Sequence, residues 1–178
     1  MTRRPAGLLI RSGAFALDYL LIAAYLVVIV GLGALLRLLA PSVAATLFGG
    51  PLIGELSGFL ALTLPISLYF VLHEASPAGA TWGKRRLGLR VVDAAGGRLG
   101  LGRSALRTAL KFVPWELAHS LIWRYAFAGD HPPAYLDIGL AVVWLLIAGT
   151  LAAVLLDRQH RSLYDLLAGT RVVARAPV

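Results

Sequence analysis

The stretch SGAFALDYLLIAAYLVVIVGLGALL, residues 12–36, contains one charged residue, Asp18. About 20 consecutive apolar residues are enough for a helix to cross the hydrocarbon of a bilayer, so this stretch can cross it and also tilt or project beyond it. It is also far longer than the roughly 7–15 apolar residues of a secretory signal peptide. We therefore expect a membrane-spanning helix here, not a cleaved leader.

The composition of the whole chain agrees with a membrane protein. Its 178 residues are 58% hydrophobic and 15% charged, with a mean hydropathy of +0.77, whereas soluble domains carry about 25% charged residues. The length fits one domain, 1–178. The chain has no Cys, which excludes disulfides, thiolate nucleophiles and Cys-ligated zinc.

The net charge of +8 has two common explanations. Excess Lys and Arg serve nucleic-acid binding or mark the cytoplasmic side of a membrane protein. The long apolar blocks favour the second explanation. We expect the lipid bilayer as a partner and no nucleic acid.

Three further segments are candidates to cross the membrane, 52–73, 108–128 and 135–156. The first contains Pro65, which usually marks a kink in a membrane helix. The segment 108–128 is ambiguous because it carries four polar groups, Lys111, Glu116, His119 and Arg124. It is either an amphipathic helix on the membrane surface or a fourth crossing with those groups facing a bundle interior.

The distribution of basic residues favours four crossings. With four, the basic amino terminus, the polar loop 74–107 and the Arg-rich tail 157–178 all lie on one side, and the opposite loops, 41–51 and 129–134, contain no Lys or Arg. That is the pattern in which basic loops stay in the cytoplasm. We predict an all-α membrane protein, a bundle of four transmembrane helices with both termini cytoplasmic.

Short β-prone runs interrupt the polar loop. LGLRVVD, residues 87–93, and RLGLG, residues 98–102, flank the turn-forming AAGG, which predicts a small cytoplasmic β-hairpin. TRVVARA, residues 170–176, adds a further strand to LGLRVVD if both lie on the same side of the membrane.

Three blocks of this sequence resemble the RDD family of bacterial membrane proteins, which is named for one Arg and two Asp. The blocks are RSGAFALD (11–18), TWGKRRLGLRVVDAAGGRLGLGRSALR (81–107) and RQHRSLYDLLAGTRVV (158–173). They occur in the order of the family and extend over nearly the whole chain. The resemblance implies a bacterial inner-membrane location and a function generally described as unknown, with transport suspected and cation–proton exchange proposed within the family.

The resemblance also assigns residues. The Arg of the family falls on Arg11, its first Asp on Asp18 and its second on Asp165. Its Thr-x-Gly-Lys element is matched by the residues Thr81, Gly83 and Lys84. One departure is Tyr164, which stands before the last Asp where the family often has His, so a mechanism that needs a histidine there is in doubt.

Arg11 and Asp18 are seven residues apart, which puts them on one helix face about 10 Å apart. That is too far for a direct ion pair, so we expect each to meet a different partner. Asp18 either binds a proton or cation or makes hydrogen bonds that hold the bundle together, because an unpaired ionised Asp in hydrocarbon costs several kcal/mol. Arg11 lies either near the cytoplasmic mouth of a pathway or at the interface as an anchor.

Asp165 has a local structural explanation. Ser162 followed by Asp165 resembles a helix N-cap with an acid at the third position, and Gly169 fits the end of the same helix. We expect a short helix beside the membrane and favour a structural role for this carboxylate. A salt bridge to Arg11 is compatible with either role.

Two other features lie on the helical segments. Glu116 and His119 share a helix face, and a proton relay that joins them to Asp18 is one interpretation, although a lone His is more often structural. Gly54 and Gly58 have the spacing of closely packed membrane helices. This favours a packing role for the region around Glu55.

The stretch GATWGKRR, residues 79–86, resembles a phosphate-binding loop only superficially. Ala78 replaces the first Gly of that motif and Arg85 replaces its Ser or Thr, so we reject nucleotide binding. We expect the residues of this stretch to contact anionic lipid or the cytoplasmic loop, with each basic residue worth about 1 kcal/mol near a charged membrane surface. The candidates are Thr81, Gly83, Lys84, Arg85 and Arg86.

Two functions remain open. The first is a small transporter or cation/proton exchanger that uses intramembrane carboxylates for protons or monovalent cations, as a homo-oligomer because four helices leave little room for alternating access. The second is a non-catalytic membrane protein that binds lipid or scaffolds a partner. No recognisable nucleophile set, cofactor motif or metal motif is present in the sequence, so we predict that the protein is not an enzyme and uses no cofactor.

Overall fold

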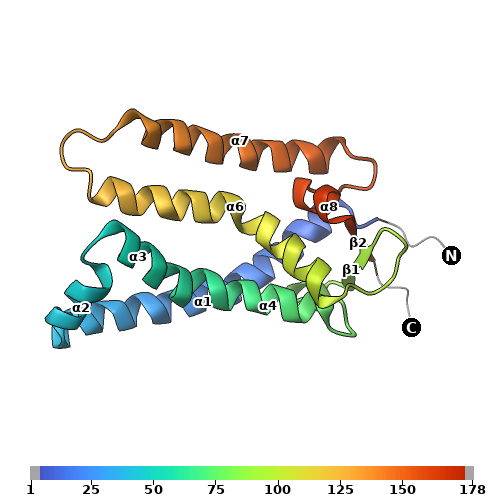
Figure 1. Ribbon diagram of the computed structural model, residues 1–178. Coiled ribbons are helices and arrows are strands. Elements are labelled where there is room, and N and C mark those ends of the chain that lie inside the picture. The colour runs from blue at the N-terminus through green and yellow to red at the C-terminus, as the bar shows by residue number, and fades with distance from the viewer. Residues whose placement is uncertain (1–4, 175–178) are drawn as a thin grey trace. The chain divides into compact units, whose positions relative to one another are not determined.

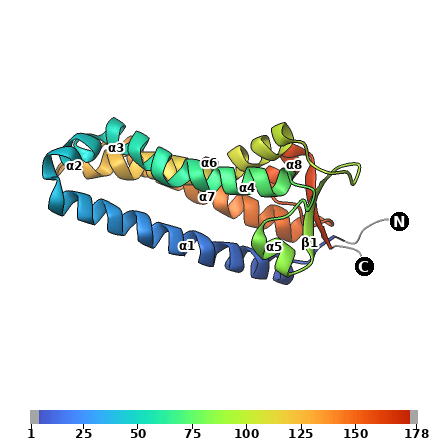
Figure 2. The same ribbon diagram turned by 90° about the horizontal axis from the view of Figure 1, so that it is seen from below.

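The computed structural model describes residues 5–174, and the chain divides into two compact units. Among these residues, the first unit contains 5–22, 67–111 and 148–174, and the second contains 23–66 and 112–147. Figures 1 and 2 label the helices and strands in two views. Each unit is described separately below.

Three helical segments of the described residues are long and apolar enough to cross a membrane. They are α1 (Leu8–Leu39), the segment Pro51–Ala75 and α7 (Ala134–Leu156). They contain the predicted spans 12–36, 52–73 and 135–156. The ambiguous segment 108–128 lies largely within α6 (Leu101–Ala126), a continuous helix that is not one of these three.

The segment Pro51–Ala75 continues as a helix through Pro65. It consists of α3 (Pro51–Gly58), the π-helical turn η1 (Phe59–Thr63) and α4 (Leu64–Ala75). Pro65 has no backbone N–H for the carbonyl of Ala61, four residues earlier. The hydroxyl of Tyr25 donates a hydrogen bond to that carbonyl instead, with a distance of 2.5 Å. A side chain of α1 thus satisfies the backbone group that proline leaves without its usual donor.

The predicted loop 41–51 is mostly helical. It contains α2 (Pro41–Phe48), which begins at a proline just as α3 does. Proline suits the first position of a helix because the backbone N–H that it lacks would have no partner within the helix. The connection between α1 and α3 is therefore a short helix followed by Gly49 and Gly50.

The predicted hairpin between LGLRVVD and RLGLG is wrong, whereas the predicted pairing of LGLRVVD with TRVVARA is confirmed as far as Ala174. Strand β1 (Leu89–Asp93) pairs antiparallel with β2 (Thr170–Ala174), with Leu89 opposite Ala174. After a turn at 93–97 the chain does not return beside β1, because Leu99 enters the core with Val91 and α6 begins two residues later. The last residues of TRVVARA lie outside the described part.

Two short helices complete the first unit, α5 (Trp82–Arg86) and α8 (Leu163–Ala168). Figure 1 shows α8 next to the sheet, in agreement with its contacts to β2. One face of the sheet packs on an apolar core of Ala6, Ala14, Leu89, Val91, Leu99 and Val172.

In the second unit, two glycines let α3 pack closely against α6. A side-chain carbon added at Gly54 would overlap the indole ring of Trp123, and one added at Gly58 would overlap the imidazole of His119. The packing interpretation of this Gly-x-x-x-Gly spacing is therefore confirmed.

We expect Gly58→Ala to destabilise the second unit, because the added methyl group needs the space that the His119 ring occupies. Gly33→Ala in α1 is the matched control, since nothing lies within 4 Å of the added carbon and Ala favours a helix over Gly by up to about 1 kcal/mol. Thermal unfolding in detergent measures both, and equal stability of the two variants would contradict the packing.

Candidate functional site

Asp18 is buried at 1% exposure and binds three donors of the first unit. Its Oδ2 accepts a hydrogen bond from the hydroxyl of Thr81 at 2.5 Å. Its Oδ1 accepts one from the backbone N–H of Gly83 at 2.7 Å and one from the hydroxyl of Tyr69 at 2.8 Å. A side chain at Gly83 would overlap the carbonyl oxygen of Ala14, so only glycine lets the backbone of α5 approach this carboxylate.

Lys84 also turns into the first unit. Its Nζ lies 2.9 Å from Oε1 of Glu74 in α4, and Glu74 is completely buried. Thr81, Gly83 and Lys84 therefore contact acidic side chains inside the protein, and Thr81 and Gly83 are too buried to meet a lipid head group. The expected contact with anionic lipid remains a prediction for the exposed Arg85 and Arg86.

Arg107 is the central residue that the sequence did not indicate. It is 2% exposed, its Nε lies 2.9 Å from Oδ1 of Asp165, and its Nη1 lies 2.5 Å from Oε2 of Glu74. Its guanidinium also lies 5.0 Å from the ring centre of Tyr164. The available signal is the spacing of Ser104, Arg107, Thr108 and Lys111, which places polar residues along one face of α6.

Asp165 connects Arg107 with α1 and β2. Its Oδ2 lies 2.9 Å from Nη2 of Arg11, a salt bridge that is compatible with either role of Asp165. The hydroxyls of Ser162 and Thr170 donate to the same carboxylate at 2.7 and 2.9 Å. The predicted capping box of Ser162 and Asp165 is present, and Gly169 ends α8 with a φ of 63°.

These contacts form one continuous network. In order along the network its members are Arg11, Asp165, Arg107, Glu74, Lys84, Thr81 and Asp18. Three acids and three bases alternate along it, and Asp165 and Glu74 each contact two bases. Buried charges are tolerated when they are paired in this way, whereas Asp18 is held by hydrogen bonds from neutral groups. Arg11 and Asp18 do meet different partners, as expected, and they lie at the two ends of this buried charge network.

The pKa of Asp165 responds to two opposing effects. Burial alone raises it, but the positive charges of Arg107 and Arg11 and the hydrogen bond from Ser162 lower the pKa well below its usual range. The carboxylate is therefore ionised at neutral pH and contributes stability only in that form.

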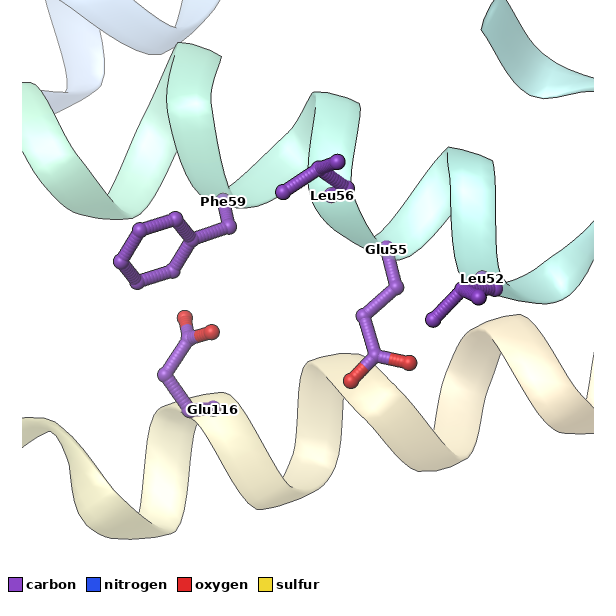
Figure 3. A pocket seen from close by; sticks show the side chains of 5 residues that line it. All are labelled: Leu52, Glu55, Leu56, Phe59 and Glu116. Atoms are coloured by element: carbon purple, nitrogen blue, oxygen red, sulfur yellow. The ribbon is translucent and has the colours of Figure 1, made fainter.

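The second unit contains a small pocket with two carboxylates, shown in Figure 3. Its volume is about 210 Å³, and it is lined by Leu52, Glu55, Leu56, Phe59 and Glu116. Glu55 comes from α3 and Glu116 from α6, and the figure shows both carboxyl groups in the space between these helices. Both carboxyl groups therefore lie next to apolar side chains.

The two carboxylates have different partners. Oε2 of Glu55 lies 2.7 Å from Nη1 of Arg124, whose charge compensates it. Oε1 of Glu116 accepts a hydrogen bond from the hydroxyl of Thr63, a neutral group. That hydroxyl in turn accepts a hydrogen bond from Nε1 of Trp115 at 2.9 Å. Glu116 is thus the carboxylate of the pocket without an Arg or Lys ion pair among the described contacts.

His119 lies close to Glu116 on the same face of α6. Its Nε2 accepts a hydrogen bond from Nε1 of Trp123 at 3.0 Å, so the proton of a neutral imidazole sits on Nδ1. Nδ1 lies 3.9 Å from Oε1 of Glu116 and has no hydrogen-bond partner among residues 5–174. The relay from these two residues to Asp18 remains a prediction, since Asp18 belongs to the first unit and they belong to the second.

We expect Arg107→Met to destabilise the protein by about 3–5 kcal/mol, because it leaves Glu74 and Asp165 buried with fewer cationic partners. Arg103→Gln is the control: its side chain is half exposed and lies 3.6 Å from Asp93, so its loss costs about 0–1 kcal/mol. Chemical unfolding of both variants in detergent tests this, and similar losses in the two would argue against the network.

The stabilisation by Asp165 should depend on pH. Because its pKa is lower in the folded protein than in the unfolded chain, its contribution is complete above a pH of about 4 and is lost as the pH falls further. The difference in unfolding free energy between wild type and Asp165→Asn should therefore shrink from pH 6 to pH 3. A difference that stays constant over this range would show that the charge of Asp165 does not stabilise the fold.

A comparison with protein families matches residues 5–169 to the RDD family. Neither a curated protein nor a solved structure matches the chain. The match includes Arg11, Asp18 and Asp165, which lie in the buried charge network, as well as the helices that enclose the pocket. The chain belongs to the RDD family of membrane proteins.

Proposed function

We propose that this protein is a cation/proton exchanger of the bacterial inner membrane and that Glu116 is the carboxylate that carries the exchanged ion. The observation that supports this is the pocket beside Glu55 and Glu116. Its volume of about 210 Å³ is below the roughly 300–1,000 Å³ of pockets for organic ligands. It suits a monovalent cation with a few water molecules.

The charge of the pocket supports exchange in particular. Arg124 compensates Glu55, which leaves the single negative charge of Glu116. One such charge attracts one proton or one monovalent cation, and the two compete for the same oxygen atoms. His119, whose Nδ1 lies 3.9 Å from Oε1 of Glu116, places a nitrogen base beside this carboxylate.

The partners of Asp18 and Asp165 favour a structural role for both. Asp18 accepts three hydrogen bonds and Asp165 contacts two arginines. Releasing either carboxylate to bind an ion would leave several buried donors without acceptors, which is unfavourable. We therefore assign ion exchange to Glu116 and the support of the first unit to the family residues Arg11, Asp18 and Asp165.

Two arguments support four crossings with both termini in the cytoplasm. Within the predicted crossing 108–128, the charge of Arg124 is paired with Glu55. In addition, twelve of the fourteen described Lys and Arg residues belong to the first unit, against five of the nine Asp and Glu. Basic residues stay on the cytoplasmic side, so we place the polar segments of the first unit there. Alternating access with so few helices suggests a homo-oligomer.

Proteoliposomes with an internal pH dye test the proposal. We expect wild type to show a proton flux that requires external sodium or potassium, and Glu116→Gln to reduce it at least tenfold, since an amide neither ionises nor binds a proton at neutral pH. Asp137→Asn is the matched control. It makes the same acid-to-amide change in the second unit, at an exposed residue that does not line the pocket.

The outcomes separate the alternatives. A flux that survives in folded Glu116→Gln would remove this residue from the mechanism. If wild type gives no flux under sodium or potassium gradients, exchange is wrong, and a non-catalytic protein that binds lipid or scaffolds a partner becomes the better explanation.

A further inference from the structure

We propose that α5 forms a binding site for the head group of an anionic phospholipid, made by Trp82, Arg85 and Arg86. This site lies in the first unit and does not depend on the exchange proposed for Glu116. It follows from the orientation of α5, from its depth along α1 and from the charges around it.

The orientation of α5 separates its residues into two sets. Gly83 and Lys84 turn inward, toward Asp18 and Glu74. The other three side chains are exposed, with Trp82 at 40%. The guanidinium of Arg86 lies 5.4 Å from the ring centre of Trp82, a cation–π contact that holds the two side chains together on the outer surface.

The contacts of Asp18 fix α5 against α1. Figure 2 shows α5 beside the first turns of α1. Thr81 and Gly83 donate hydrogen bonds to Asp18, and the backbone of Gly83 packs closely against Ala14. These contacts fix the position of α5 along α1. The depth of Asp18 in the membrane is therefore also the depth of the exposed residues of α5.

The length of α1 allows Asp18 to lie at a membrane interface. With 32 residues it exceeds the roughly 20 that cross about 30 Å of hydrocarbon. If Arg37 marks one interface, as a basic residue near a helix end does, about 20 residues back along the helix is Leu17, next to Asp18. The exposed Phe15 and Tyr19 stack at this same level, with ring centres 5.9 Å apart. Aromatic residues collect at the interface between hydrocarbon and head groups.

The charges at this level select an anionic head group. Arg85 and Arg86 are exposed neighbours, and arginine binds phosphate oxygens through a pair of parallel hydrogen bonds. The nearby acids are occupied inside the protein, since Asp18 is 1% exposed and Glu74 is fully buried. An interfacial indole next to two arginines matches a lipid that offers a phosphate and a negative net charge, such as phosphatidylglycerol.

Lipid binding to the purified full chain tests the site. Native mass spectrometry in detergent gives the apparent affinity for phosphatidylglycerol and for phosphatidylcholine. We expect wild type to prefer phosphatidylglycerol and Arg85→Gln/Arg86→Gln to lose about thirtyfold in affinity for it, from two basic contacts at a charged surface. Arg98→Gln/Arg103→Gln is the matched control, because it removes the same charge from two other exposed positions of the first unit.

A second measurement tests the depth without altering the arginines. Phosphatidylglycerol brominated near the head group should quench tryptophan fluorescence of wild type more than that of Trp82→Phe, and lipid brominated near the chain end should not show this difference. Unchanged affinity in Arg85→Gln/Arg86→Gln, an equal loss in the control, or stronger quenching of Trp82 from the chain end would each overturn the proposal. None of these measurements involves an ion gradient, so they stand whether or not exchange is observed.

Discussion

The ion pairs of Arg107 with Glu74 and Asp165 hold the first unit together. The buried guanidinium of Arg107 connects α6 with α4 and α8. Each of the two acids also forms a second ion pair, Glu74 with Lys84 and Asp165 with Arg11. A buried charge that loses its partner is strongly destabilising. Each charged member of the network therefore requires its neighbours. The short helices α5 and α8 are held in place by the buried ion pairs of Lys84 and Asp165 with residues of the longer helices.

This dependence explains the placement of the family residues. Arg11 and Asp18 lie nearly two turns apart on α1, and through them one helix contacts both ends of the network. The remaining family acid, Asp165, also caps α8 with Ser162. The carboxylate of Glu116 has a different environment, with a neutral hydroxyl donor and a nearby imidazole. Asp18 and Asp165 have several buried donors or cations, whereas Glu116 has a single neutral donor in the described part of the chain. This difference is the physical basis for giving the first two a structural role and the third a role in ion exchange.

Hydropathy and local signals predicted much of this structure. Long apolar runs identified three spans, and the cap of α8 followed from Ser162 and Asp165 because capping depends on neighbours in sequence. The hairpin failed because β1 had two possible partners, and Leu99 is better placed in the core than in a strand. Arg107 was missed for a related reason: a sequence displays charges but not their pairs, and a buried arginine looks like an exposed one until its acids are located.

The π-helical turn before Pro65 has a consequence for the whole span from Pro51 to Ala75. An α-helix rotates by about 100° per residue, so one additional residue in a turn shifts the rotational phase of everything after it by about that angle. The two halves of this span therefore follow separate helical periodicities, although the helix is unbroken. Gly54 and Gly58 belong to one phase and Glu74 to the other, so a helical wheel drawn across the turn assigns these residues to the wrong sides of the helix.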